Sequence, residues 1–406
     1  MPVGLSGLPP LYPVAGVRLG AAAAGIRKRD RNDLLLIELI DGAHSAAVFT
    51  RNAFCAAPVT VGRRHVELTP PRYLLVNSGN ANAGTGKAGL DDVRACCDAV
   101  ATLTGCNSEE VLPFSTGVIG EPLPVEKIIT ALPDARERLS EEGWVSAAQA
   151  IMTTDTVPKG ASRQIDLDGH IITVTGIAKG AGMIHPNMAT MLAFIATDAV
   201  VEPGPLRRCL HDAVATSFNC ITVDGDTSTN DACVLMATGA SGQPVIDTRN
   251  SEHYRRLYEA VVEVCTTLAQ VIVRDGEGAT KFITVDVLGG ADSKECRRVA
   301  DAVALSPLVK TAFFASDPNW GRVLAAVGRA GVPDLDINKV SMDFNQIGIV
   351  RHGARDADYT EEAGVKVLQQ PEIVIRIDLG RGTGRARVWT CDLSDEYVRI
   401  NAEYRT

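Results

Sequence analysis

The sequence predicts a protein of the α+β or layered α/β class, and three observations support that prediction. The chain has 406 residues, of which 46% are hydrophobic and 22% charged, so it is long and apolar enough for one large domain or two. Short apolar runs between polar or glycine-rich turns are typical of buried strands. Stretches with apolar residues at helical spacing are interspersed with them, which is typical of a fold that layers helices on sheets.

The individual elements follow from these two patterns. Strands are predicted where apolar, partly β-branched runs occur, at 34–39, 46–49, 73–76, 171–177, 191–196, 282–287 and 373–377. Helices are predicted where apolar residues recur every three or four positions, at 90–103, 125–132, 147–152, 206–217 and 254–273. Residues 203–205 and 289–290 are candidate breaks between domains, but neither has the composition of a linker.

The charge and the cysteine pattern argue against several classes of function. The formal net charge is -9, which argues against nucleic acid or an anionic membrane as the main partner. The 10 cysteines form no CxxC pair, so we interpret them as buried thiols in a reducing compartment and expect no metal site. The sequence shows neither a secretory signal nor the roughly 20-residue apolar run of a membrane span, so we expect a cytoplasmic protein.

The first stretch that could carry chemistry is residues 179–190, KGAGMIHPNMAT. Its glycines, proline and asparagine predict a constrained turn between two strands. Thr190 opens the apolar run 191–196, so its hydroxyl would be rigidly held at the mouth of a buried strand, which suits a nucleophile. A threonine at a strand start is also ordinary, and His185 is either a base or a loop histidine.

Two further stretches, 113–120 and 274–281, contain candidate site residues. Thr116 and Gly117 fall where a strand can end in a glycine turn, so a hydroxyl and adjacent N–H groups could stabilise an oxyanion there. A plain turn is the alternative. Glu277 has a glycine on each side, so the backbone can approach a ligand closely. A surface loop would have the same composition.

Several familiar motifs are rejected. Residues 76–87 suggest a phosphate-binding loop, but Thr85 stands where the lysine is needed. Residues 380–384 lack the dinucleotide-binding spacing. Residues 222–231 are dense in carboxylates, but their order does not match a calcium loop, and a polar pocket wall or a turn is preferred. The seven histidines form no metal-binding spacing, and no GxSxG motif supports a serine triad.

Taken together, these stretches resemble the ornithine acetyltransferase (glutamate N-acetyltransferase) family of arginine biosynthesis. Residues 179–192 closely resemble the self-processing segment of that family. Other matches occur in the same order, at 76–86, 115–117, 152–155, 219–231, 275–281, 316–322 and 401–406. The resemblance extends from about Gly16 to Thr406, and no position that the family uses chemically departs from its pattern.

The resemblance implies a fold, an assembly and a set of site residues. The fold is a layered αββα-type sandwich shared with self-cleaving aminopeptidases. Cleavage between Ala189 and Thr190 would give an alpha fragment, 1–189, and a beta fragment, 190–406, in a two-plus-two heterotetramer. Thr190 is implied as the nucleophile, with Thr116 and Gly117 as the oxyanion hole. The residues implied to line the substrate site are Thr153, Lys179, Thr190, Glu277, Asn401 and Thr406.

The implied activity is the transfer of acetyl from N-acetylornithine to glutamate through acetyl-Thr190. Elementary chemistry agrees, because Thr190 Oγ can attack the Ala189 carbonyl to give an ester that water opens. The released α-amine, with a pKa of about 7.7–8.0, is a suitable base for its own hydroxyl. Lys179 is expected to hold a substrate carboxylate and Glu277 an ammonium group. No tightly bound cofactor is expected, and acetyl-CoA is expected as a second donor because the family is often bifunctional.

The end of the chain is predicted as a docked strand, because Val398 and Ile400 alternate with Arg399 and Asn401. Such a tail could close the pocket and exclude water. Two rival functions stay open. A self-cleaving hydrolase or aminopeptidase would use the same threonine but pass the acyl group to water. A non-enzymatic small-ligand binding protein would keep its chain uncut.

Overall fold

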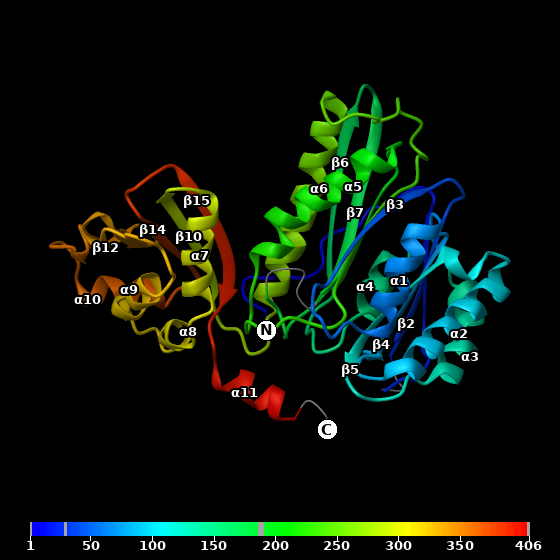
Figure 1. The fold of residues 1–406 in the computed structure, drawn as a ribbon, viewed down its shortest axis with the longest axis horizontal. Coiled ribbons are helices and arrows are strands. Elements are labelled where there is room, and N and C mark those ends of the chain that lie inside the picture. Colours follow the sequence, from blue (N-terminus) through cyan, green and yellow to red (C-terminus); the bar gives the residue numbers. More distant parts are fainter. Residues whose placement is uncertain (1, 28–30, 186–190, 404–406) are drawn as a thin grey trace. The chain divides into compact units, whose positions relative to one another are not determined.

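The computed structural model describes residues 2–27, 31–185 and 191–403, and the chain divides into two compact units. The large unit consists of Gly7–Asn219 and Asp226–Ile272. The small unit consists of Met1–Ser6, Cys220–Gly225 and Val273–Thr406. Figure 1 shows the elements of each unit in the order of the sequence. Each unit has its own sheets and core, so each is described by itself.

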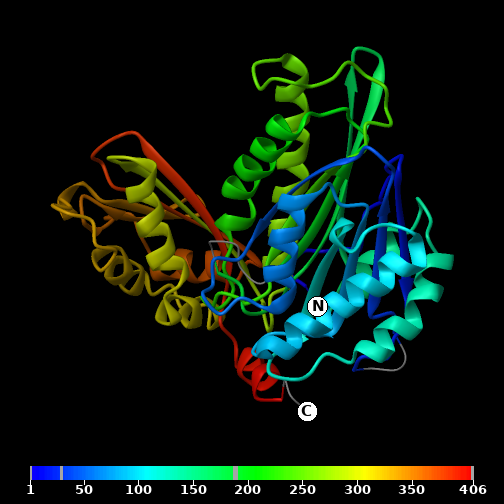
Figure 2. The same cartoon turned by 45° about the vertical axis from the view of Figure 1, so that its right-hand side comes forward.

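The first sheet of the large unit has four strands in the order β1-β2-β4-β5. Their bounds are β1 (Val17–Ala22), β2 (Leu34–Leu39), β4 (Tyr73–Asn80) and β5 (Val111–Val118). β4 and β5 run parallel, and the other neighbours are antiparallel. The helices α1 (Ala57–Leu68), α2 (Gly86–Thr104) and α3 (Val125–Glu137) cover the outer face (Figure 2), and their apolar side chains share a core with it. The short 3-10 helix η1 (Ser108–Glu110) leads into β5.

The second sheet of the large unit has five strands in the order β3-β9-β8-β7-β6. Their bounds are β3 (His44–Phe49), β9 (Ala232–Ala237), β8 (Leu192–Thr197), β7 (His170–Lys179) and β6 (Lys159–Leu167). β8 and β9 are parallel and the other pairs antiparallel. Two helices pack on this sheet, α5 (Pro203–Thr216) and α6 (Glu252–Arg274). The space beside Gly176 in β7 is filled by Val264 and Leu268 of α6.

The core of the large unit lies between its two sheets. One face of the four-stranded sheet and one face of the five-stranded sheet contribute to a single apolar cluster, together with α4 (Trp144–Ala150). Phe114 on β5 and Phe194 on β8 meet edge to face across this core, with ring centroids 5.1 Å apart. Such a pair stabilises by about 0.5–1.5 kcal/mol beyond its buried area. With helices outside both sheets, the large unit is an αββα sandwich, so the predicted fold is confirmed.

The small unit is built on one six-stranded sheet, in the order β13-β12-β11-β14-β10-β15. The strand bounds are β10 (Phe282–Gly290), β11 (Ser341–Phe344), β12 (Ile347–Arg351), β13 (Ala354–Arg355), β14 (Glu372–Asp378) and β15 (Gly384–Cys391). Four helices share a core with it, α7 (Ser293–Ala304), α8 (Pro307–Phe314), α9 (Trp320–Gly328) and α10 (Glu361–Leu368). The remaining elements are η2 (Phe218–Cys220), η3 (Ile337–Lys339) and α11 (Asp395–Ala402).

Every strand and helix predicted from hydrophobic spacing is present, with bounds shifted by a few residues, except at the chain end. There the predicted strand is wrong, because residues 395–402 form the helix α11. Ser394 caps the helix by accepting the N–H of Tyr397, and Glu396 pairs with Arg399 one turn later. A serine cap and acidic residues in the first turn favour a helix, and they outweigh a two-residue alternation over only four positions.

Candidate active site

The predicted cleavage site lies in the connection between β7 and β8, two antiparallel neighbours of the five-stranded sheet. Lys179, the last residue of β7, pairs directly with Leu192, the first residue of β8. Residues 180–185 and Met191 of this connection are described, and His185 lies there in a loop. Ala189 and Thr190 lie outside the described residues. The connection is therefore a hairpin, and a buried carboxyl group holds the backbone at each of its two ends.

At the first end, Asp155 accepts the N–H of Gly180 at 2.7 Å and the N–H of Thr153 at 3.0 Å. Its fully buried side chain also pairs with the equally buried Lys159, whose Nζ lies 2.6 Å from Oδ1. Burial alone would raise the pKa of Asp155, but the ammonium groups of Lys159 and Lys179 outweigh burial and hold that pKa below its usual range. This end therefore carries an ionised and well-satisfied carboxylate.

At the second end, Asp231 accepts the N–H of Met191 on Oδ1 at 2.9 Å. Its Oδ2 is buried and has no hydrogen-bond partner among the described residues. Burial raises the pKa of Asp231 well above its usual value, and the Met191 N–H, the Lys179 ammonium and the Ser228 hydroxyl only partly oppose this. Within the described chain, no lysine forms a salt bridge with Asp231 as Lys159 does with Asp155, so this end carries a carboxyl group biased towards its neutral form.

Lys179 and Thr116 meet within the large unit. Lys179 Nζ donates to Thr116 Oγ1 at 3.2 Å, and both side chains are buried. Because the hydroxyl oxygen of Thr116 accepts from a cation, its own O–H is polarised and becomes a stronger donor to a further acceptor. That is the property an oxyanion-hole hydroxyl needs.

Gly117 lies next to Thr116 near the end of β5, and only glycine fits there. Its φ is 133°, outside the range that side chains favour. A Cβ at this position would lie 2.2 Å from the carbonyl carbon of Gly79, which pairs with Gly117 across the parallel strands β4 and β5. Two backbones therefore approach closely at the carboxyl ends of parallel strands, where α/β proteins place their ligands.

The predicted residues of the small unit also come together. Asn401 Nδ2, on α11, donates to Glu277 Oε2 at 2.8 Å, and Glu277 is only 8% exposed. The helix approaches the Glu277 loop so closely that a Cβ on Gly278 would lie 2.5 Å from the Tyr397 nitrogen. Ser394 Oγ adds a hydrogen bond to the Gly278 carbonyl at 2.6 Å. The tail thus packs on the Glu277 loop as a helix that ends at Ala402, and Thr406 lies outside the described residues.

Sequence reasoning missed the two buried carboxyl groups. Asp155 is the last residue of the family-like stretch 152–155, and Asp231 is the last residue of the polar stretch 222–231. The sequence alone predicts no role for either side chain. Thr153, which was predicted, is connected to the site through the bond from its N–H to Asp155. The density of polar residues at 222–231 was the signal available for Asp231.

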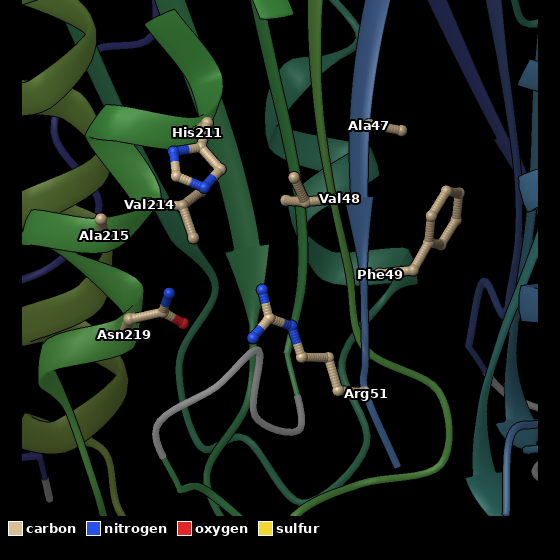
Figure 3. A pocket seen from close by; sticks show the side chains of 8 residues that line it. All are labelled: Ala47, Val48, Phe49, Arg51, His211, Val214, Ala215 and Asn219. Atoms are coloured by element: carbon tan, nitrogen blue, oxygen red, sulfur yellow. The ribbon is translucent and has the colours of Figure 1, made fainter. Parts of the chain in front are cut away.

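The large unit also has a pocket of about 200 Å³ between β3 and α5 (Figure 3). Its apolar lining is Ala47, Val48, Phe49, Val214 and Ala215, and its polar lining is Arg51, His211 and Asn219. None of the predicted site residues lines it, and no step of the expected chemistry needs it. In the part of the chain that the structure describes, every helix is too short or too polar to cross a lipid bilayer.

Comparison with known proteins places the chain in a family. The ArgJ family model matches residues 18–406. The chain is 62% identical over 396 residues to the arginine biosynthesis bifunctional protein ArgJ of Methylococcus capsulatus, covering 98% of this chain and 97% of that protein. It is 58% identical over 406 residues to the protein of the same name from Pseudomonas fluorescens, covering 100% of both.

Among solved structures, the bifunctional protein ArgJ of Bacillus halodurans matches with 38% identity and a TM-score of 0.50. The match covers 52% of this chain and 97% of that one. The family resemblance predicted from the sequence is therefore confirmed: the chain belongs to the ArgJ family of arginine-biosynthesis proteins.

Proposed function

We propose that the chain is a glutamate N-acetyltransferase that cuts itself between Ala189 and Thr190 and then carries acetyl on Thr190. It takes acetyl from N-acetyl-L-ornithine and passes it to L-glutamate, which yields L-ornithine and N-acetyl-L-glutamate. Family membership supports this reaction. The observation that supports it best is the buried pair of Lys179 and Thr116, in the unit whose β7–β8 connection includes the proposed cleavage site.

Self-cleavage follows from the chemistry of the Thr190 hydroxyl. Thr190 Oγ attacks the Ala189 carbonyl carbon, the Ala189–Thr190 amide bond breaks, and the nitrogen takes up the hydroxyl proton. The ester that results is opened by water, which leaves a carboxylate on Ala189 and a free α-amine and hydroxyl on Thr190. The products are the alpha fragment, 1–189, and the beta fragment, 190–406.

Acetyl transfer then uses the new amine as the base. The α-amine takes the proton of Thr190 Oγ as this oxygen attacks the acetyl carbonyl, and ornithine leaves with that proton. The Thr116 hydroxyl, with the Gly117 backbone N–H beside it, donates to the oxyanion in both half-reactions. Lys179 supports Thr116 through the bond to its oxygen. Glutamate then attacks acetyl-Thr190, so the kinetics are ping-pong.

The remaining predicted residues bind substrate groups. Lys179 holds a substrate carboxylate, and Thr153 contributes its hydroxyl. Glu277 holds an ammonium group such as the side-chain amine of ornithine. Asn401 supports this role, because its side-chain amide donates to Oε2 of Glu277 and so holds the carboxylate in place. Thr406 supplies the terminal carboxylate and hydroxyl of the chain.

The enzyme is bifunctional and also takes acetyl from acetyl-CoA. The names of relatives at 62% and 58% identity support this. Acetyl-CoA acts as a co-substrate, and no tightly bound cofactor takes part. The fragments assemble as a two-plus-two heterotetramer, and the enzyme works in the cytoplasm.

Donor and acceptor assays test this function. Purified protein is supplied with N-acetylornithine, with and without glutamate, and acetylated Thr190 is sought by mass spectrometry after acid quench. Glutamate should divert acetyl from hydrolysis to N-acetylglutamate. Release of free acetate at the same rate with and without glutamate would favour the hydrolase reading. An uncut chain that binds these compounds without turnover would favour a binding protein.

A further inference from the structure

Asn230 is a buried side chain just before β9 whose amide is hydrogen-bonded at both of its ends. The residue is only 6% exposed. Its Nδ2 donates to the carbonyl of Ser115 at 2.9 Å and to the carbonyl of Ala81 at 2.6 Å. Its Oδ1 accepts the hydroxyl of Thr229 at 2.6 Å. Because two carbonyl acceptors need an NH₂ group, an amide fits here in one orientation only, and a carboxylate does not fit.

The two carbonyls belong to the neighbouring strands β4 and β5 and to their exit. Ser115 lies in β5, one residue before Thr116, and Ala81 directly follows β4. The carbonyl of Ser115 and the nitrogen of Thr116 share one planar peptide group, so holding that carbonyl fixes how the chain enters Thr116. The N–H of Ala81 also donates to the carbonyl of Val118 at 2.9 Å. The exit of β4 is therefore bonded to β5 both directly and through the Asn230 amide.

The backbone that carries this amide is itself held on both sides. The carbonyl of Thr229 accepts the N–H of Ala56 at 2.9 Å, and the carbonyl of Asp231 accepts the N–H of Thr50 at 2.9 Å. The chain then enters β9, which pairs with β3 and β8 within the five-stranded sheet. A side chain on so constrained a backbone can fix the position of the segments that it bonds.

We propose that Asn230 is a positioning residue for the oxyanion hole: by bonding β5 to the exit of β4, its amide sets where the Thr116 hydroxyl and the Gly117 N–H point. This inference rests on the proposed function, which makes Thr116 and Gly117 the oxyanion donors. Such donors stabilise a transition state only when they are held within about 0.5 Å of the productive geometry. Asn230 acts through β5 and does not touch the substrate.

The first test compares Asn230→Asp with Gln243→Glu. Asn230→Asp keeps the size of the side chain but faces both carbonyls with an oxygen, so kcat should fall about 10–100-fold while KM stays nearly unchanged. Gln243→Glu is the matched control, because Gln243 is 3% exposed and its Nε2 donates to the carbonyl of Val200 at 3.2 Å, beyond the far end of β8. The control should keep the parental kcat and KM. Rates with N-acetylornithine and glutamate are expressed per cut chain, which intact mass counts.

The second test asks whether Asn230 acts through Thr116. In a Thr116→Ala background the donor that Asn230 positions is already gone, so adding Asn230→Asp should lower kcat by at most about threefold. A side chain that only stabilises the fold would lower kcat by the same factor in both backgrounds. If Asn230→Asp does not accumulate as folded protein, Asn230→Ala takes its place with the same predictions, since it also removes both donors and adds no charge.

Three results would overturn the inference. They are a folded Asn230 variant with parental kcat, an equal fall in kcat with and without Thr116, and an equal fall in Gln243→Glu. A parental protein that is cut but transfers no acetyl to glutamate would instead overturn the proposed function itself.

Discussion

The two ends of the β7–β8 hairpin use the same residue type, with pKa values shifted in opposite directions. Asp155 faces the buried ammonium of Lys159 and is ionised, whereas Asp231 has no such salt bridge within the described residues and burial raises its pKa. Each carboxyl group accepts one backbone N–H of the hairpin, and Asp155 also accepts from the Thr153 N–H and from Lys159. The difference teaches that a buried carboxyl can hold a backbone N–H with or without a salt bridge, and that the one without it is biased towards its neutral form.

The largest expected effect comes from breaking the charged end. Lys159→Met leaves Asp155 buried without its salt-bridge partner, which should lower the free energy of unfolding by about 3–5 kcal/mol. Denaturant titration measures this loss. The variants also carry Thr190→Ala, so that every molecule is an uncut chain. Arg255→Met is the control, because Arg255 pairs with Glu252 and Glu259 on an exposed helix surface, where such pairs contribute less than about 1 kcal/mol. Equal losses in both variants would mean that Asp155 is not an anchor.

The second-largest effect is expected at Thr116, whose hydroxyl oxygen accepts a hydrogen bond from Lys179. Thr116→Ala removes one oxyanion donor, which should lower turnover by about 10²–10³ while KM stays nearly unchanged. Steady-state rates with N-acetylornithine and glutamate measure both quantities. Thr60→Ala serves as the control, since Thr60 lies on α1 and its hydroxyl donates to the carbonyl of Ala56, the residue just before that helix. A large rise in KM with turnover preserved would make Thr116 a binding residue instead.

The two ends should also respond to pH with opposite signs. The pKa of Asp155 is lowered in the folded state, so its contribution is complete above the unfolded pKa and is lost as the pH falls. The pKa of Asp231 is raised, so folding stability falls as the pH rises above its unfolded pKa, with a limiting slope of about 1.4 kcal/mol per pH unit.

Uncut Thr190→Ala protein should therefore gain stability on Asp231→Asn substitution as the pH rises above about 4, and the gain should vanish below it. Urea unfolding between pH 4 and 7 reports the difference. A difference that does not change with pH would show that Asp231 ionises as easily in the folded chain as in the unfolded one.

The smallest effect tests whether the hairpin works without the tail. Truncation after Ile400 removes Asn401 and its bond to Glu277 but leaves both ends of the hairpin intact. Cleavage at Ala189–Thr190 should persist, while transfer to glutamate falls about tenfold and the ratio of hydrolysis to transfer rises. Coupled assays of acetate and N-acetylglutamate measure this ratio. Wild-type transfer by the truncated protein would place the tail outside the site.

Hydrophobic spacing was sufficient for the strands and helices that form the αββα core. It identified 34–39, 73–76 and 191–196 because each is a run of apolar residues buried on both faces. It failed at α11, where a capping serine and acidic residues decide the structure. Hydrophobic spacing also missed α7. Asp292 caps that helix by accepting the N–H of Glu295, but the helix predictions relied on apolar spacing and not on capping residues.

The candidate site likewise contains some residues that the sequence predicts and some that it does not. Thr116, Gly117 and Lys179 were predicted, and the structure brings Thr116 and Lys179 within 3.2 Å of each other. Asp155 and Asp231 could not be predicted, because their roles depend on burial and on backbone N–H groups that are 25 and 40 residues away in sequence. Only the folded chain shows which carboxyl in a polar stretch is buried and which of the two buried ones has a cation beside it.

The intact mass of the purified wild-type protein under denaturing conditions tests the central claim most directly. Self-cleavage predicts two chains, 1–189 and 190–406, whose masses sum to that of the precursor plus one water. Thr190→Ala, prepared in parallel, should remain a single chain of 43.0 kDa. A single 43.0 kDa chain in the wild-type protein, or two fragments in Thr190→Ala, would contradict the account.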